Sequence, residues 1–486
     1  DTGVLTGVNN VVIGKLAGQD LTAADGNVII GEDAGKGQTT ADNNVLIGQG
    51  AGEAITTGGD NIFIGQAAGD GHDAETNNLG IGKGALGGPI NGGENNVAIG
   101  NFSQDALTAG DENVSVGYHS MGGVNTGKQN VAIGYTAMQG LTSGDDNIAI
   151  GRTAMRNGVT TGDGNIAIGS VAGDDMTSGA GNVLVGFEAG QKLTEGGFNT
   201  FIGYQAGAAM TTAGDQIAIG FQALETSDTE TNNIAIGKNV LRLTNGGTSN
   251  VGVGNGTLDA VTSGDNNTAI GHNAGTGINT GGQNITIGDA AGALINSGTG
   301  NICIGKDAGT ATTTLTTGAN NILIGQAVRG SAVGNSSEIV IGSLNVAGKG
   351  AQTAFINPDG GTIFNGGNTT AFQTTSDRRI KKKIVDNNIG LDVINKIQIR
   401  NFEYRTLEEI TDFDNPESAV VDKQGTQLGA IAQEIEEILP DLINTETTGV
   451  KTLNADNLTW YLINAVKDLS AENEELKTRI TALENA

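Results

Sequence analysis

A short motif, an Asn followed by a strand-forming triplet and a Gly, recurs through the first two thirds of the chain at an almost constant interval. The closing Gly occurs twenty times, and sixteen of the nineteen intervals are 17 residues, two are 18 and one is 20. Chance does not produce such spacing, so this stretch is a repeat array. The closing glycines are Gly14, Gly31, Gly48, Gly65, Gly82, Gly100, Gly117, Gly134, Gly151, Gly169, Gly186, Gly203, Gly220, Gly237, Gly254, Gly271, Gly288, Gly305, Gly325 and Gly342.

Each repeat, with consensus N-I-x-I-G-x-x-A-G-x-x-L-T-T-G-x-x, predicts one short strand and several turns. β-Branched residues flank position x and favour extended backbone. Gly closes the strand where a positive φ or a close chain approach is expected, and L-T-[TS]-G predicts a second short extended piece and a turn. A single repeat cannot bury a core, whereas stacked repeats can. We therefore expect residues 1–342 to form a mostly β fold, a β-solenoid about 95 Å long at about 4.8 Å per paired strand.

The Asn that opens each strand has a structural interpretation. It recurs at Asn27, Asn44, Asn61 and onward, and amides stacked at one position can hydrogen-bond along the rod as a ladder. We expect this role in preference to ligand binding. Gln216 and Glu338 replace the Asn in two repeats, and we expect them to interrupt the ladder.

Position x bears on the oligomeric state. An isolated solenoid would alternate apolar and polar residues along the strand, yet x is mostly apolar, so both strand faces are expected to be buried. One face would fill its own turn and the other would meet a neighbouring chain. This predicts a homo-oligomer, most simply a parallel trimer; the alternative is a monomeric solenoid with a groove of small residues. The apolar x residues include Val12, Ile29, Leu46, Phe63, Ala98, Ala132, Ala149, Ala167, Leu184, Phe201, Ala218, Ala235, Ala269, Leu323 and Val340.

The I-x-I-G-x-x-A pattern over residues 10–342 resembles the head repeats of trimeric autotransporter adhesins and similar repeats of phage fibres. The resemblance implies a trimeric β-solenoid. Residues 5–7 before Asn10 are similar to the end of an earlier turn, so we expect an attachment region to precede residue 1.

After Gly342 the regular spacing stops. Residues 343–375 remain rich in Gly, Thr and Asn but now carry Phe355, Phe364 and Phe372. We expect irregular β structure that caps the distal end of the rod, because solenoid ends need caps. Loops that bind a partner at a fibre tip are the alternative.

From Ser376 onward the composition changes. Residues 391–404 predict a helix and then a strand, and residues 427–443 predict a strand that turns into a helix ending at Pro440. From residue 462 the pattern is helical, with seven positions spaced alternately by three and four as in the a/d seam of a short coiled coil. They are Leu462, Val466, Leu469, Asn473, Leu476, Ile480 and Leu483.

The stretch SDRRIKKKI, residues 376–384, concentrates positive charge in an acidic chain. It holds five of the 25 Lys and Arg residues, against 53 Asp and Glu overall. A Ser hydroxyl becomes a nucleophile when a base removes its proton, and Lys serves as base when burial or neighbouring cations lower its pKa. Ser376 and Lys381 could form such a pair and act on the carbonyl of Thr375. The alternative is that the cations hold acidic chains together at this junction.

SDRRIK, then GAIAQEIEEILPDLI and LTWYLINAVKDLSAENEELKTRI, resemble in order the C-terminal intramolecular chaperone of endosialidase-type phage tailspikes and fibres. The resemblance implies a chaperone domain at residues 376–461 followed by a coiled-coil helix at 462–486, which trimerise the chain and set its register. It further implies self-cleavage between Thr375 and Ser376. Ser376 would be the nucleophile and Lys381 the base, with Asp377 and Arg379 as further motif members. Lys383 departs from the family pattern, in which Asn is common there.

Several classes of ligand are disfavoured. A net charge of −28 opposes binding to nucleic acid or an anionic membrane, and no run of 18 apolar residues predicts membrane insertion. Cys303 is the single Cys, and His72, His119 and His272 lack metal-ligand spacing. We expect no metal site and no cofactor.

These features predict a homotrimeric viral tail fibre, located on the virion, that binds a host surface receptor, with a glycan as one candidate, and contacts other tail proteins. The alternatives are a cellular adhesin or filament subunit on a cell surface, and a tailspike that degrades polysaccharide. The only enzymatic activity that the motifs suggest is a single-turnover Ser-Lys autoproteolysis.

Overall fold

The computed structural model describes residues 6–88, 91–123, 126–158, 160–310, 315–357, 363–365, 378–411, 424–445 and 450–485. The chain divides into two compact units, residues 1–374 and 375–486. None of the helices in these ranges is long and apolar enough to cross a membrane.

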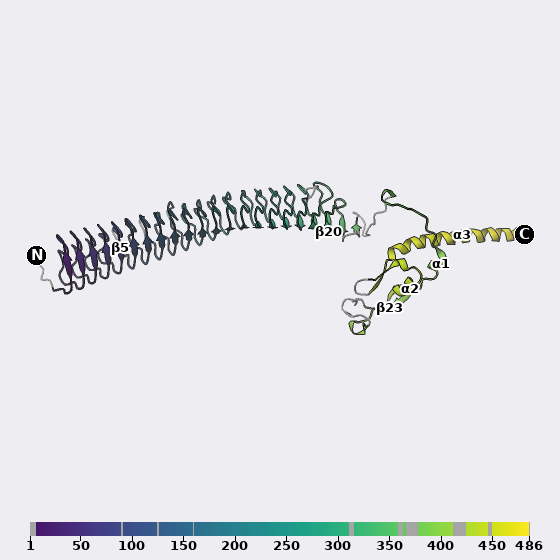
Figure 1. The fold of residues 1–486 in the computed structure, drawn as a ribbon, viewed down its shortest axis with the longest axis horizontal. Helices are drawn as coiled ribbons and strands as arrows, with labels where there is room; N and C mark the ends of the chain where they lie inside the picture. The colour runs from purple at the N-terminus through teal and green to yellow at the C-terminus, as the bar shows by residue number, and fades with distance from the viewer. Residues whose placement is uncertain are drawn as a thin grey trace. The chain divides into compact units, whose positions relative to one another are not determined.

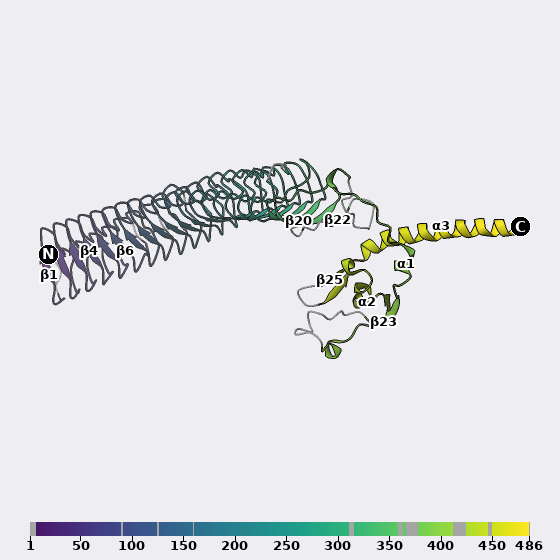
Figure 2. The ribbon, with the colours of Figure 1, turned by 45° about the vertical axis from the view of Figure 1, so that its right-hand side comes forward.

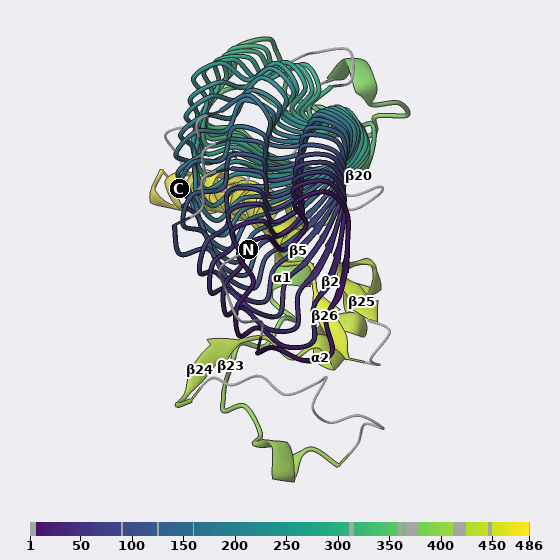
Figure 3. The same cartoon turned by 90° about the vertical axis from the view of Figure 1, so that its left-hand side faces the viewer.

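The first unit is a parallel β-solenoid with one short strand per repeat, so the predicted fold class is confirmed (Figure 1, Figure 2). Consecutive strands pair in register, as Val28 does with Val45, and viewed end-on the turns overlie one another (Figure 3). The 18- and 20-residue intervals also keep this register: Ile148 pairs with Ile166 and Ile302 with Ile322. The extra residues are therefore absorbed outside the strands.

The repeat strands are β1 Val11–Ile13, β2 Val28–Ile30, β3 Val45–Ile47, β4 Ile62–Ile64, β5 Leu79–Ile81, β6 Val97–Ile99, β7 Val114–Val116, β8 Val131–Ile133, β9 Ile148–Ile150, β10 Ile166–Ile168, β11 Val183–Val185, β12 Thr200–Ile202, β13 Ile217–Ile219, β14 Ile234–Ile236, β15 Val251–Val253, β16 Thr268–Ile270, β17 Ile285–Ile287, β18 Ile302–Ile304, β19 Ile322–Gln326 and β20 Ile339–Leu344.

Position x points into the solenoid. Ile29, Phe63 and Phe201 at this position are fully buried, while the strand residues on either side of x are half-buried or exposed. The sequence pattern left open which apolar face lines the turn. The structure shows that x fills the interior and that the flanking Val and Ile residues face outward.

The L-T-[TS]-G segment was predicted to be a second short extended piece and a turn, and in most repeats it forms a bend without a regular strand. An isolated β-bridge joins Leu141 and Thr160 there. Neighbouring turns are nevertheless joined by backbone hydrogen bonds, such as the one from Thr22 N–H to the carbonyl of Thr39 at 3.0 Å. Small side chains and bends allow this stacking without regular strand geometry.

The predicted Asn ladder is confirmed. The side-chain oxygen of each ladder Asn accepts a hydrogen bond from the backbone N–H of the next, as Asn44 does from Asn61 at 2.8 Å. The predicted interruption at Gln216 is wrong: its backbone N–H donates to Asn199 at 3.0 Å, and its side-chain oxygen accepts from Asn233 N–H at 3.1 Å. The longer Gln side chain still delivers its oxygen to the next turn.

Glu338 does end the ladder. Its backbone N–H donates to the side-chain oxygen of Asn321 at 2.9 Å, but its carboxylate turns to the backbone N–H groups of Ser331 (3.0 Å) and Gly350 (2.9 Å). A buried carboxylate must be hydrogen-bonded, and these amides satisfy it at the last regular turn.

The closing glycines are required by both conformation and space. Gly151, for example, has φ +140°, and a Cβ there would lie 2.4 Å from the carbonyl oxygen of Gly169 in the next turn. Only Gly combines this backbone conformation with such a close approach.

Two further strands follow the repeats in the same sheet. β21 Ala354–Asn357 pairs in parallel with β20, and β22 Ile363–Asn365 pairs antiparallel with β21. The change of direction ends the parallel stacking. Phe372, which the sequence assigned to the cap, lies outside the described residues.

The second unit is a small α+β domain with a long terminal helix. Ile435, Leu439 and Leu442 form its core, against which Leu458 and Tyr461 pack. β23 pairs antiparallel with β24, and β25 with β26. Its elements are η1 Arg378–Ile380, α1 Leu391–Ile394, β23 Arg400–Phe402, η2 Leu407–Glu409, β24 Gln427–Gly429, α2 Ala432–Glu436, η4 Pro440–Leu442, β25 Ile443–Thr445, β26 Lys451–Leu453, η5 Ala455–Asn457 and α3 Leu458–Glu484.

Two predicted boundaries in this unit are corrected. α2 ends at Glu436, and Pro440 begins the 3₁₀ turn η4 instead of ending the helix. Proline is well suited to a first helical position because its missing N–H is not needed there. α3 begins at Leu458, four residues before the predicted start at Leu462.

Candidate functional site

The predicted cleavage junction is only partly within the described residues. Thr375, Ser376 and Asp377 lie outside them. Arg379 belongs to the 3₁₀ turn η1, and Lys381 follows it, with its backbone N–H donating to the carbonyl of Arg378 at 3.2 Å. Of the four motif residues, the structure describes Arg379 and Lys381, and the side chains of both are exposed.

The backbone at Lys383 favours the Asn that the related pattern has at this position. Its φ is +53°, in the left-handed region. Asn is several-fold enriched there, whereas a Lys side chain brings no compensating local hydrogen bond. The left-handed backbone at this position therefore fits the Asn of the related pattern better than the Lys of this chain.

Beyond the basic stretch, residues 387–391 form a segment, here called the strap, that is bound by α3. Asn464 Nδ2 donates to the carbonyls of Asn387 (2.7 Å) and Ile389 (3.2 Å). One turn further along the helix, Asp468 Oδ2 accepts from the backbone N–H of Leu391 at 2.9 Å. We call Asn464 and Asp468 the clamp.

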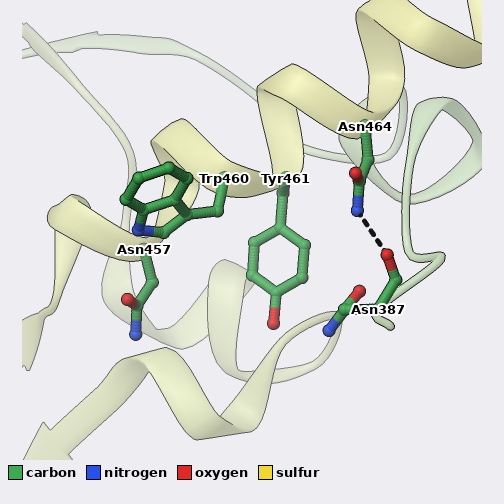
Figure 4. Close-up of a pocket in the computed structure, with 5 residues that line it drawn as sticks. All are labelled: Asn387, Asn457, Trp460, Tyr461 and Asn464. Carbon is green, nitrogen blue, oxygen red and sulfur yellow. Dashed lines mark hydrogen bonds between the residues drawn. The ribbon is translucent and has the colours of Figure 1, made fainter. Parts of the chain in front are cut away.

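A pocket of about 270 Å³ lies where the strap meets the start of α3. In Figure 4, Asn464 points from α3 to Asn387 on the facing segment, Tyr461 projects beside them, and Trp460 and Asn457 lie on the other side of Tyr461. Trp460 is 64% exposed. Amide and aromatic groups line this pocket, so it can bind backbone or other polar groups. Its lining residues do not include a nucleophile paired with a general base.

Sequence reasoning missed this pocket and the clamp. The available signal was the 4-3-4 spacing of Asn457, Tyr461, Asn464 and Asp468, a second stripe along the helix that carries the a/d pattern. Polar residues on such a stripe are ordinarily solvated, so nothing in the sequence distinguished them as contacts.

The a/d seam of α3 is exposed in the single chain. Its six apolar members are each exposed by half or more, from Leu462 at 50% to Leu483 at 77%, and Asn473 is also exposed. A helix with such a row of exposed apolar residues offers a surface for other helices.

The solenoid carries a much longer exposed apolar surface. We call the first and third residues of strands β2 to β18 the outer stripe, two adjacent columns of Val and Ile with Leu79, Thr200 and Thr268 as the exceptions. Ile168, Ile202 and Ile236 on this stripe are 37–38% exposed. An apolar sheet face of this length is unusual for a solvated surface.

The solenoid surface also has a small acidic hollow of about 190 Å³, lined in part by Asp33 and Glu53. Lys36 Nζ lies 3.4 Å from the Asp33 carboxylate and 3.8 Å from that of Glu53. Glycoside hydrolysis uses two carboxylates in distinct acid and base roles. Lys36 lies near both carboxylates, so it does not give Asp33 and Glu53 the distinct acid and base roles that this reaction needs.

The three His residues lie apart. His72 is buried against Phe63, His119 lies 3.8 Å from Asp105, and His272 pairs with Asp289 at 2.9 Å. Within the described ranges no group of three or more His, Cys, Asp or Glu side chains is arranged to hold a metal ion.

Comparison with known proteins identifies one related stretch. Residues 376–444 match the family model described as the chaperone of endosialidase. No curated protein and no solved structure matches the chain. The matched stretch contains the basic junction, α1 and α2, but neither the solenoid nor α3 with its clamp. The predicted resemblance of the C-terminal region to this chaperone is therefore confirmed, whereas the resemblance of the repeats to adhesin heads stays a prediction.

Proposed function

We propose that this chain forms a homotrimeric viral tail fibre that binds a host surface and is assembled by its own C-terminal chaperone. The observation that carries the proposal is the order of the two units: a stretch similar to the endosialidase chaperone follows a twenty-turn solenoid and its two closing strands. The host receptor, with a glycan as one candidate, and contacts to other tail proteins are parts of this proposal.

The outer stripe and the α3 seam support assembly of three copies. Both are apolar and at least partly exposed. The outer stripe runs along the solenoid and the seam runs along α3, so identical chains aligned in parallel could bury both surfaces against one another. Burying apolar surface contributes about 25 cal/mol per Å². A surface with a net charge of −28 otherwise opposes association, so the apolar stripes must supply the attraction.

The need for a chaperone follows from the repeats. Nearly identical turns allow neighbouring chains to pair one turn out of register at little energetic cost, and long β structures with non-local pairing fold slowly and expose sticky edges. A C-terminal trimer sets the register once, after which the solenoid can extend from that end.

We further propose self-cleavage at the junction. Lys381 accepts the proton of the Ser376 hydroxyl, and the oxygen attacks the carbonyl carbon of Thr375. The peptide C–N bond breaks, the amine of Ser376 is released with a proton, and Thr375 becomes an ester of the Ser376 oxygen. Water then hydrolyses the ester. Because Lys381 is exposed in the single chain, the desolvation that a Lys base needs would have to come from trimer assembly.

The chaperone role is tested by deleting residues 376–486 before expression. We expect the solenoid alone to be insoluble, because its register is not set and its outer stripe stays exposed. Soluble trimers from the deleted chain would refute the chaperone role.

Self-cleavage is tested by intact mass of the wild type beside Ser376→Ala. Loss of the last 111 residues in the wild type only would establish cleavage, and identical masses would remove it from the proposal.

The trimer is tested by native mass spectrometry of Ile202→Asp, which places a charge on the outer stripe. We expect monomers or aggregates in place of trimers. The matched control is Thr40→Asp at an exposed position off the stripe, which should remain trimeric. Immunogold labelling with an antibody against the solenoid would separate virion tails from the alternative, a cell-surface adhesin.

A further inference from the structure

Helix α3 has two faces with different tasks. With 3.6 residues per turn, Asn464 lies about 160° around the helix from Leu462, on the side opposite the seam. Asn457, Tyr461, Asn464 and Asp468 follow one another at spacings of four, three and four, so they form one stripe. The seam face is exposed, while this second stripe faces the strap of the same chain.

The strap is held through its backbone at three points. Asn464 Nδ2 donates to two of its carbonyls, at 2.7 and 3.2 Å, and Asp468 accepts from Leu391 N–H at 2.9 Å. Gly390 between them is buried, and a Cβ there would lie 1.9 Å from Asp468 Oδ2. Both partners are therefore matched to this contact: Asp468 supplies the acceptor, and Gly390 lacks the side chain that would collide with it.

The clamp restricts where the junction can lie. Asn387 lies six positions after Lys381, and six residue steps span at most about 20 Å. The clamp also depends on the helix, because two residues four apart reach the same segment only when α3 is helical between them. Much of α3 is exposed, and an isolated helix of this kind is marginal in water.

We propose that Asn464 and Asp468 are positioning residues that tie the geometry of the junction to the assembly of α3. When three seams associate, α3 is stabilised and the clamp holds the strap. The basic stretch at residues 378–383 is then held within reach of the helix. This inference rests on the proposed self-cleavage for its chemical consequence, but the coupling from the seam to the strap stands on the contacts alone.

The first test measures self-cleavage by intact mass over time in otherwise wild-type chains. Asn464→Ala and Asp468→Ala should each slow cleavage at least tenfold while native mass spectrometry still shows trimers. Asp468→Asn keeps an oxygen that can accept from Leu391 and should stay within about threefold of the wild type. Glu475→Ala, on the same stripe of α3 beyond the strap, is the matched control and should not change the rate.

Two results would overturn the positioning role. Either both Ala variants cleave at the wild-type rate, or they lose the trimer together with cleavage, which would make them ordinary folding variants. Gly390→Ala serves as an independent probe from the other side, since its Cβ should displace the Asp468 carboxylate and slow cleavage as Asp468→Ala does.

The second test needs no cleavage and therefore separates this inference from the proposed reaction. Hydrogen exchange of the Leu391 amide is followed in the Ser376→Ala chain, with and without Val466→Asp on the seam. We expect the seam variant to speed exchange at Leu391 at least tenfold, as Asp468→Ala does. Unchanged exchange at Leu391 in a chain whose seam no longer associates would refute the coupling, whether or not the wild type cleaves itself.

Discussion

The side-chain oxygen of Asn165 accepts two hydrogen bonds from Asn182, one from its backbone N–H and one from its Nδ2, both at 3.0 Å. Asn182 stands in the same relation to Asn199. Each amide thus satisfies the backbone of the following turn at a position where no water is available. The solenoid interior thus contains a hydrogen-bonded ladder beside its apolar contacts.

Asn182→Ala should destabilise the solenoid by about 2–3 kcal/mol, because the buried N–H of Asn199 loses its acceptor. Asn182→Gln should cost clearly less, since Gln216 already delivers its oxygen to Asn233 from the same position. Urea unfolding followed by circular dichroism measures both. Equal losses for the two variants would contradict the ladder as the cause.

Gly151→Ala should be among the most damaging single substitutions, at about 3 kcal/mol or more, because it combines an unfavourable φ with a backbone clash. Gly164 provides the control: its φ is +65° and a Cβ there would meet nothing within 4 Å. Gly164→Ala should cost only about 1 kcal/mol. A comparison of the two midpoints of urea unfolding decides whether the close approach matters.

The sequence was sufficient to predict the repeat fold, because the closing Gly recurs twenty times at a nearly constant interval and the strand, the Gly and the Asn each have a distinct physical role. The prediction for Gln216 was wrong, because the ladder requires only a side-chain oxygen that reaches the next turn, and Gln216 supplies one. The sequence also predicted a second short extended piece and a turn at L-T-[TS]-G, where bends suffice to carry the inter-turn hydrogen bonds.

His72 should make the stability of the solenoid sensitive to acid. Burial lowers the pKa of His72 to about 4, with neighbouring Glu75 opposing the shift, and neither ring nitrogen has a hydrogen-bond partner among the described residues. His72 therefore binds a proton near pH 6.5 in the unfolded chain but only near pH 4 in the folded chain. Stability should fall across that window by up to about 3 kcal/mol as pH decreases.

The measurement is urea unfolding at pH 7 and pH 4.5 in the wild type and in His72→Leu. Leu21 and Leu107 occupy the same repeat position in other turns, so the variant fits the interior. The difference between the two proteins isolates His72 from the many carboxylates. A pH dependence that is identical in both would show that His72 does not titrate in this range.

Cys303 should be inert in the native protein. Burial raises the pKa of its thiol to about 12, and the thiolate is the reactive form. We expect no reaction with a thiol reagent such as DTNB at pH 8 under native conditions, and one thiol per chain after denaturation. Rapid labelling of the folded protein would indicate that this part of the solenoid opens.

Lys383→Asn should stabilise the C-terminal unit by about 0.5–1 kcal/mol, because Asn tolerates the left-handed backbone at this position better than Lys. Trp460 is the only Trp of the chain and belongs to the same unit, so its fluorescence reports thermal unfolding there. Lys383→Gln is the control and should leave the melting temperature unchanged. A gain from Gln equal to that from Asn would point to charge and not to backbone.

The C-terminal site was predictable only in part. SDRRIK and the segments after it carry a recognisable order, which led to Ser376 and Lys381. The clamp of Asn464 and Asp468 was not predictable, because it joins residues more than seventy positions apart through backbone groups of the strap. The repeat made the Asn ladder visible in the sequence, whereas the clamp occurs once and its backbone partners carry no side-chain signature.

The pairing of Ile302 with Ile322 across a 20-residue repeat, in the same register as its 17-residue neighbours, has a consequence for how such genes can change. Recombination between repeats would add or remove whole rungs without touching either terminus of the array or the unit that follows it. The length of the solenoid can therefore vary by whole repeats between related chains, while the C-terminal unit stays the same.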